Sequence, residues 1–243
     1  MIAALSPVFS GPLSWLENWA VMAADAPDGA VAARSIFTPD GLDRVIALYE
    51  QHRTRADPRA ILSVWSGYYF AATIYIPLAA QLLLNRFIPA ELDRIGLVLD
   101  TSGEPRQLVV PCSGRLAPNI TFMQRLQQLL ETNLTPAIRS MATHNGLSPK
   151  VYWNNAAQYL AHLAQSLHAM PQATAEMRQE AAAVLSLRHF PDGRRNPFCQ
   201  PMRDAAGDRV WQGCTRRLCC IRFRIPALGY CENCPVRCKG RQD

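Results

Sequence analysis

Residues 60–85 read AILSVWSGYYFAATIYIPLAAQLLLN and contain no charged side chain. A run of this length could cross a bilayer as a helix. It also contains Ser63, Thr73 and Gln81, and Pro77 should break or kink any helix formed here. We therefore predict two core helices of a soluble domain. A membrane-spanning helix and a peripheral membrane contact are the alternatives.

The flanking sequence carries start signals for further helices. Thr38-Pro39 predicts a helix to about Arg53, because threonine suits the N-cap and proline suits the first helical position. Asp57-Pro58 repeats this signal ahead of the apolar run. Apolar spacing and proline positions predict further helices over residues 121–133, 136–145, 148–170 and 171–187.

A β-hairpin is predicted over residues 95–110, where two apolar runs flank the turn-rich residues 100–104. In the first 35 residues, Trp15 and Trp19 suggest a short helix packed on the body. Helical periodicity stops near Arg188. The expected fold class is therefore α+β: a mainly α-helical body with a β-hairpin over residues 1–187, then a small C-terminal, loop-rich cysteine module over residues 188–243.

Composition separates the two parts. The chain has 243 residues, of which 49% are hydrophobic and 18% charged, so a sizeable core is expected. Seven of the eight cysteines fall between Cys199 and Cys238, and residues 188–243 carry 12 basic against 5 acidic side chains. With no basic residue before Arg34, a secretory signal is not expected, and the protein is predicted to be cytoplasmic. In a reducing compartment, clustered thiols indicate metal or redox chemistry.

The cysteine spacing points to an iron–sulfur cluster. Cys219-Cys220 is followed after ten residues by Cys231 and then, after two more, by Cys234. A Cys-x-x-Cys pair alone is common in zinc ribbons and redox sites. The adjacent pair is unusual for a single zinc ion, because neighbouring side chains tend to point apart. A cluster with two irons relieves that demand, although the spacing does not assign a cysteine to either iron.

This motif resembles the signature of FhuF-type ferric-siderophore reductases. The resemblance extends to the run from Cys219 to Pro226, to Pro235 after the last cysteine, and more loosely to Trp153-Asn154-Asn155-Ala156 in the body. It implies a cytoplasmic one-electron reductase whose [2Fe–2S] cluster is bound by Cys219, Cys220, Cys231 and Cys234; a peripheral contact with the inner membrane is the alternative that the apolar run leaves open. It also implies a ferric siderophore substrate, of the hydroxamate type by analogy.

The implied reaction depends on the difference between a siderophore's affinities for ferric and ferrous iron. Oxygen donors hold ferric iron much more tightly than ferrous iron, so one electron releases the metal. Arginines 216, 217, 222 and 224 flank the cysteine pair and are expected to stabilise the reduced cluster and attract an acidic electron donor such as a ferredoxin. Trp65, Tyr68, Tyr69 and Trp153 are candidate siderophore contacts, but their helical spacing favours the core.

The remaining residues support other chemistries weakly. Free thiols are expected at Cys112, Cys199, Cys214 and Cys238, and the five histidines show no metal-ligand spacing. One alternative is a zinc-stabilised module that binds protein or nucleic acid through the basic tail; without a basic recognition helix, no nucleic-acid partner is expected. The other is an iron–sulfur sensor or siderophore-binding protein without turnover. A colourless protein would indicate zinc.

Overall fold

The computed structural model describes residues 2–53, 56–203 and 215–239, with side chains up to Arg237. The helices are α1 (Ala33–Ile36), α2 (Pro39–His52), α3 (Pro58–Leu84), α4 (Phe122–Leu129), α5 (Thr135–Asn145), α6 (Pro149–Ser166), α7 (Ala175–Ser186) and α8 (Pro235–Lys239). The strands are β1 (Ala20–Met22), β2 (Val31–Ala32), β3 (Arg86–Phe87), β4 (Gly96–Leu99), β5 (Pro105–Val110), β6 (Arg115–Leu116), β7 (Met202–Arg203) and β8 (Thr215–Arg216). The predicted α+β class, mainly helical, is confirmed.

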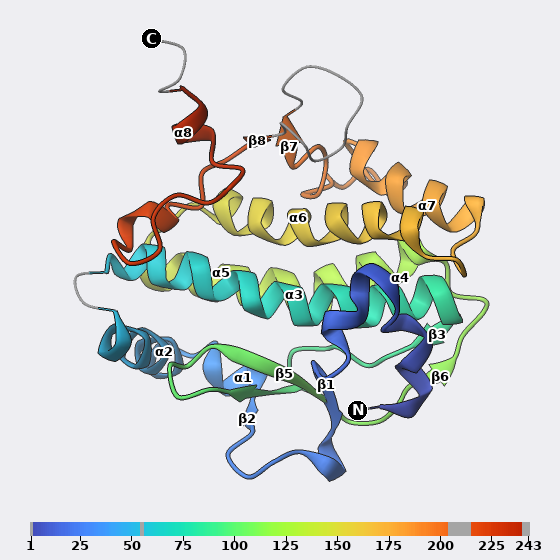
Figure 1. The fold of residues 1–243 in the computed structure, drawn as a ribbon, viewed down its shortest axis with the longest axis horizontal. Helices are drawn as coiled ribbons and strands as arrows, with labels where there is room; N and C mark the ends of the chain where they lie inside the picture. Colours follow the sequence, from blue (N-terminus) through green and yellow to red (C-terminus); the bar gives the residue numbers. More distant parts are fainter. Residues whose placement is uncertain (1, 54–55, 204–214, 240–243) are drawn as a thin grey trace.

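The long helix α3 is the centre of the fold. Figure 1 shows it between a layer with α6 and α7 on one side and a layer with α2 and the small sheet on the other. Every residue from Tyr69 to Leu82 is buried. By length and composition α3 could cross a membrane, but 78% of its most apolar 18-residue window is buried inside the protein. Its apolar character is therefore that of a core helix.

The prediction of two helices separated at Pro77 was wrong, because α3 is continuous from Pro58 to Leu84. Proline there removes the amide that would bond the Thr73 carbonyl. Neighbouring elements surround the helix on both sides of Pro77, and this packing holds the backbone helical despite the missing hydrogen bond.

Two of the predicted helix starts are confirmed. The Thr38 hydroxyl accepts a hydrogen bond from the Gly41 amide at 3.1 Å, and Asp57 accepts one from the Arg59 amide at 2.9 Å. The last helix of the body differs from its prediction, since α7 begins at Ala175 rather than at Pro171. Its N-cap is Thr174, which bonds the Met177 amide, and so a capping threonine overrides the proline signal.

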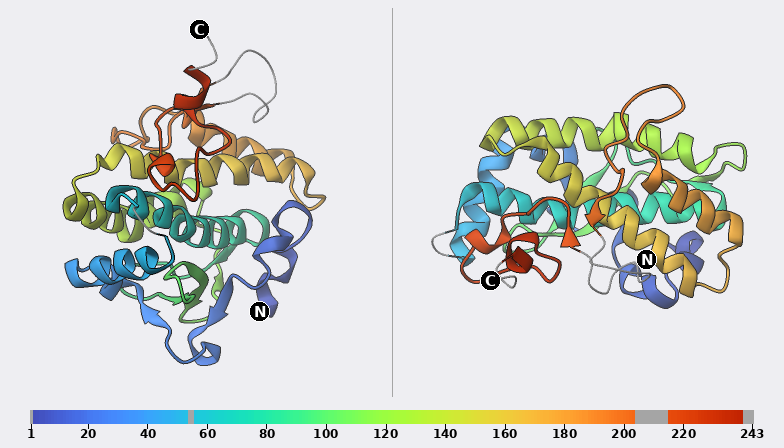
Figure 2. Two further views of the ribbon diagram at one scale, coloured as in Figure 1. Left: turned by 60° about the vertical axis from the view of Figure 1, so that its left-hand side comes forward. Right: turned by 90° about the horizontal axis from the view of Figure 1, so that it is seen from above.

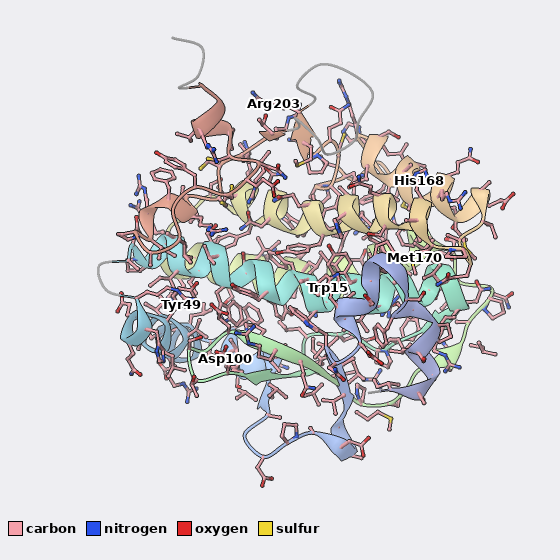
Figure 3. The ribbon with its side chains drawn as sticks, viewed as in Figure 1. Trp15, Tyr49, Asp100, His168, Met170 and Arg203 are labelled. Atoms are coloured by element: carbon pink, nitrogen blue, oxygen red, sulfur yellow. The ribbon has the colours of Figure 1, made fainter. Side chains whose placement is uncertain are left out.

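The predicted hairpin is confirmed as the antiparallel pair β4–β5. It belongs to a four-stranded sheet in the order β1-β5-β4-β2, in which β1 runs parallel to β5. Strands β1 and β2 have three and two residues, too few for an alternating pattern to show in the sequence. Before β1 the chain forms two 3-10 turns, Ala3–Val8 and Gly11–Leu16. In Figure 3, Trp15 lies against the middle of α3, with its ring 5.5 Å from that of Tyr75.

Residues 215–239 lie over the N-terminal ends of α3 and α6, as the two views of Figure 2 show. Ile225 anchors this segment in a small core with Tyr49, Ala60 and Ile61. Phe190 and Phe198, which follow the predicted boundary at residue 188, are buried in the main core. A separate module beginning at residue 188 stays a prediction.

Candidate metal centre

The four motif cysteines lie at the two ends of one loop. Cys219 and Cys220 follow strand β8, and Cys231 and Cys234 come just before helix α8. A backbone hydrogen bond of 2.9 Å from the Arg216 amide to the Asn233 carbonyl joins the two ends. The local fold therefore brings together thiols that are up to fifteen positions apart in the sequence.

The backbone turns sharply directly after the adjacent cysteines. Ile221 has φ of +54°, a left-handed conformation that a β-branched residue rarely adopts. In this turn the Ile221 amide donates a hydrogen bond of 3.3 Å to Cys219 Sγ. Such conformations cost on the order of 1–3 kcal/mol and persist where the surroundings fix them. Here Ile221 packs against the small core around Ile225, which holds the turn and the orientation of the pair.

Two of the four sulfur atoms form a close pair. Cys220 Sγ and Cys231 Sγ are 3.7 Å apart, and Cys219 and Cys234 lie on the same loop. Two sulfur ligands on one tetrahedral metal, with bonds of about 2.3 Å, stand about 3.8 Å apart. The Cys220–Cys231 pair therefore has the spacing of two ligands to one metal. Among the described residues, no group of three or more Cys, His, Asp or Glu side chains is placed around one metal ion.

Four thiols on one loop, two of them at the spacing of ligands to one metal, provide the donor set of a cysteine-bound centre. The donor chemistry agrees, because iron–sulfur clusters are bound by cysteine thiolates. Cys220 and Cys234 are buried and the other two cysteines are half-buried, as suits a centre with limited access to water.

The electrostatic surroundings favour a thiolate at Cys220. The hydrogen bond from Cys231 lowers the pKa of Cys220 to about 5 against the opposing effect of burial, and the nearby Arg216 guanidinium lowers it further. Donating this hydrogen bond to Cys220 raises the pKa of Cys231. Burial, the largest cause, raises the pKa of Cys219, and the Ile221 amide opposes it. The thiolate is the form that binds metal.

Arg216 is a buried cation behind this site. Its side chain is 7% exposed, and no carboxylate among the described residues lies within 4 Å of it. It donates a hydrogen bond to Asn155 Oδ1, while its Nε has no partner. Buried charges are normally paired, so Arg216 is suited to face an anionic group, and its charge acts to lower the pKa of both Cys220 and Cys231.

Two asparagines of α6 connect the cysteine loop to the body. Asn155 donates to the Ser63 carbonyl at 2.9 Å and to the Ser63 hydroxyl at 3.1 Å. The Ser63 hydroxyl in turn donates to the Cys220 carbonyl at 2.7 Å. Asn154 accepts from the Leu218 amide at 2.6 Å and donates to the Pro201 carbonyl at 2.8 Å. Helices α3 and α6 therefore fix the backbone on both sides of Cys219.

Sequence reasoning gave none of these body residues a role at the site. Asn154 and Asn155 contributed only to the resemblance, and Ser63 only to the case against a membrane span. The available signal was the presence of polar side chains within apolar helices: buried polar groups require partners, and these find theirs in the tail.

The other flanking arginines have separate surroundings. Arg224 forms an ion pair of 2.8 Å with Asp57 at the start of α3, and Arg222 donates to the Leu228 carbonyl. Arg217 is exposed. Asp57, bound first by Arg59 and then by Arg224, has its pKa lowered to about 2. The expected collective role of these arginines stays a prediction, since only Arg216 is buried against the thiols.

Where the structure describes them, the remaining candidates form no hydrogen bond with the motif thiols. Cys112 is exposed, and Cys199 is half-buried. Cys214 and the side chain of Cys238 lie outside the described part of the chain. Trp65 and Tyr69 are core residues, and the Trp65 indole donates to the Gly103 carbonyl at 2.7 Å.

A cavity of about 930 Å³ opens between the body and the tail, next to the cysteine loop. Trp153 and Asn154 line it from α6, and Arg217 and Leu218 line it from the tail. Leu218 in its wall is adjacent in the chain to Cys219, so the cavity lies beside the cysteine loop. The ring of Trp153 is held edge-on to Phe198 at 6.0 Å.

The fold and this thiol site together define an iron–sulfur redox protein, and comparison with known proteins specifies the family. Residues 63–209 match the family model described as ferric iron reductase FhuF-like transporter, and residues 216–235 match the FhuF 2Fe-2S C-terminal domain. The chain thus belongs to the FhuF family of ferric siderophore reductases and carries its [2Fe–2S] domain. It is also 20% identical over 220 residues to the ferric siderophore reductase of Escherichia coli strain K12, covering 87% of this chain and 81% of that protein.

Proposed function

We propose that this protein reduces siderophore-bound ferric iron, using one electron from a [2Fe–2S] cluster bound by Cys219, Cys220, Cys231 and Cys234. The observation that carries the proposal is the 3.7 Å pairing of Cys220 with Cys231 in the loop that also holds Cys219 and Cys234. The family match over residues 63–209 and the similarity to the Escherichia coli reductase support the substrate.

The pairing also suggests how the ligands divide between the irons. Cys220 and Cys231 would bind one iron, because their sulfurs have the spacing of two ligands to one tetrahedral metal, and Cys219 and Cys234 would be left for the other. Each iron would then receive one residue of the adjacent pair. The left-handed turn at Ile221 and the bond from its amide to Cys219 Sγ separate the two neighbouring side chains.

When bound, the cluster supplies single electrons, the stoichiometry that Fe(III) needs to become Fe(II). The protein's own residues control its surroundings. Arg216 places a fixed positive charge where the negative charge of the reduced state would gather, and α3 and α6 cover the site from beneath. Ferrous iron then leaves, because the siderophore's oxygen donors hold it weakly, and no covalent bond of the siderophore is broken.

The electron must come from another protein in this proposal. An acidic donor such as a ferredoxin fits the exposed basic side chains Arg217, Arg224 and Arg237 near the cysteine loop. We place the reaction in the cytoplasm, where such donors are found and where released ferrous iron is used. A peripheral contact with the inner membrane belongs to the same proposal.

Turnover with a ferrous trap tests the function. The protein, an electron donor and a ferric siderophore are mixed anaerobically, and Fe(II) is measured as its coloured complex. The proposal predicts several Fe(II) released per protein and almost none with Cys231→Ser, whereas Cys112→Ser should match the wild type. Release that is equal with and without the protein would contradict it.

A further inference from the structure

The cavity beside the cysteine loop is strongly basic. Six cationic side chains line it, against the single carboxylate of Glu131 among its described residues. They are Lys150, Arg188, Arg194, Arg195, Arg203 and Arg217. Five of the six cations come from residues 188–217, whereas residues 1–187 are almost neutral. The positive charge of the chain therefore gathers in one concave surface shared by the body and the tail.

Most of these cations have no anionic partner among the residues that the structure describes. Arg194 is neutralised by Asp192 at 2.7 Å and by Glu131. In the described residues, no carboxylate lies within 4 Å of the other five. All five are exposed, with Lys150 in the first turn of α6 and Arg203 on β7 across from it. Figure 3 labels Arg203 on the tail side of the molecule, above α6.

A concave site with several unpaired cations attracts anions, because low-dielectric walls concentrate the field of its charges. Its volume of about 930 Å³ is at the upper end of the range for small-molecule pockets, which is about 300–1,000 Å³. Trp153 and Phe190 add apolar surface to the lining, so the occupant should carry flat or apolar groups as well as negative charge.

The net charge of a ferric siderophore depends on its chelating groups, so a preference for anions indicates a substrate class. Three hydroxamates, each a monoanion, leave a complex with Fe(III) with no net charge at its core. Catecholates and α-hydroxycarboxylates bind as dianions, so their ferric complexes are anionic. The planar ring of a catecholate can also lie against Trp153, and arginine guanidinium groups suit its oxygen atoms.

We infer that the cavity between the body and the tail is the substrate site, and that it selects ferric siderophores with net negative charge, of the catecholate or hydroxycarboxylate class. This rests on the proposed reductase function and departs from the hydroxamate class expected from the sequence resemblance. The site meets the requirement of electron transfer because Leu218 in its wall is bonded through the chain to Cys219.

Binding of gallium(III) siderophores tests the inference without any electron transfer, since gallium has the charge of ferric iron and is not reduced. Calorimetric titration of the purified holoprotein should show at least tenfold tighter binding of a tris-catecholate complex than of a tris-hydroxamate complex. The catecholate affinity should fall steeply as salt rises from 50 to 500 mM, because exposed charges are screened.

Two charge-neutralising variants locate the site. Lys150→Gln and Arg203→Gln change two cations of the cavity lining, one on α6 and one on β7, and together they should weaken catecholate binding about tenfold while leaving hydroxamate binding unchanged. Arg34→Gln is the matched control, because Arg34 is exposed on α1, away from the cavity. All three side chains are exposed, so the variants should keep the wild-type melting temperature.

The outcomes separate this inference from the proposed function. Equal affinity for the two gallium complexes, or no effect of the double variant, would overturn the anionic site even if the protein reduces ferric siderophores. Selective catecholate binding that depends on Lys150 and Arg203, in a protein that releases no ferrous iron, would uphold the site and overturn the reductase proposal.

Discussion

Replacing Asn155 with leucine should loosen the cysteine loop from the helical body. Asn155 is 3% exposed, and its oxygen is the acceptor for the buried guanidinium of Arg216. Leucine has the same number of side-chain heavy atoms and the same branching, so the change removes polar contacts without opening a cavity. A lost hydrogen bond to a charged group costs about 1.5–3 kcal/mol. The amide's donor bonds to Ser63 and Ser66 add roughly 1 kcal/mol, because both serines retain other partners.

The expected loss in the free energy of unfolding is therefore about 3 kcal/mol, equal to a fall in Tm of roughly 6–12 °C for a protein of this size. Circular dichroism measures Tm, and visible absorbance in the same scan follows loss of the cluster, which should occur earlier in the variant. Gln165→Leu is the control: Gln165 is half-buried on the same helix and should shift Tm by less than about 2 °C. Equal Tm values for the two variants would show that the Asn155 network does not hold the loop.

Three further predictions concern the site. Arg216→Gln should lower the cluster's reduction potential, since a partly buried unit charge is worth on the order of 2 kcal/mol, or about 85 mV for one electron; a spectroscopic redox titration checks this, and an unchanged or higher potential would refute it. Cys231→Ser should lose most iron and acid-labile sulfide on purification, whereas Cys112→Ser, which changes an exposed thiol, should keep both. Asp57→Asn should lower Tm by a few degrees at most near pH 6, because its pair with Arg224 is largely exposed. The folded pKa of Asp57, about 2, lies below its ordinary value, so the wild-type advantage should be present above pH 4 and disappear as pH falls towards 2.

Local signals in the sequence predicted the elements with a short-range cause. Thr38 and Asp57 cap helices in the structure because their side chains bond amides only two or three residues away. The hairpin β4–β5 is similarly local. The predicted break at Pro77 was wrong because long-range packing decides the structure there. The proline's local effect is real, but the surrounding core outweighs it, and that core consists of segments distant in sequence.

In the site, too, local features were predictable from the sequence and long-range contacts were not. The four cysteines were predicted as ligands from their spacing and from a resemblance, and the structure brings the sulfurs of Cys220 and Cys231 to within 3.7 Å of each other. Their pairing depends on the positive φ of Ile221, which residue types do not reveal. The hydrogen bond from Ser63 to the Cys220 carbonyl joins residues 157 positions apart, so no local sequence pattern predicts it. The basic cavity likewise needed the fold, because Lys150 and Arg203 meet only when α6 and the tail are placed together.

The most direct test of the central claim is a single turnover followed by stopped-flow absorbance. The protein is reduced anaerobically with one equivalent of electrons per cluster and mixed with one equivalent of ferric siderophore, in the presence of a ferrous chelator. The account predicts that the bleached visible bands of the cluster return as Fe(II) appears, at one Fe(II) per cluster reoxidised and with the same time course. A cluster that stays reduced while the siderophore keeps its ferric iron would contradict it.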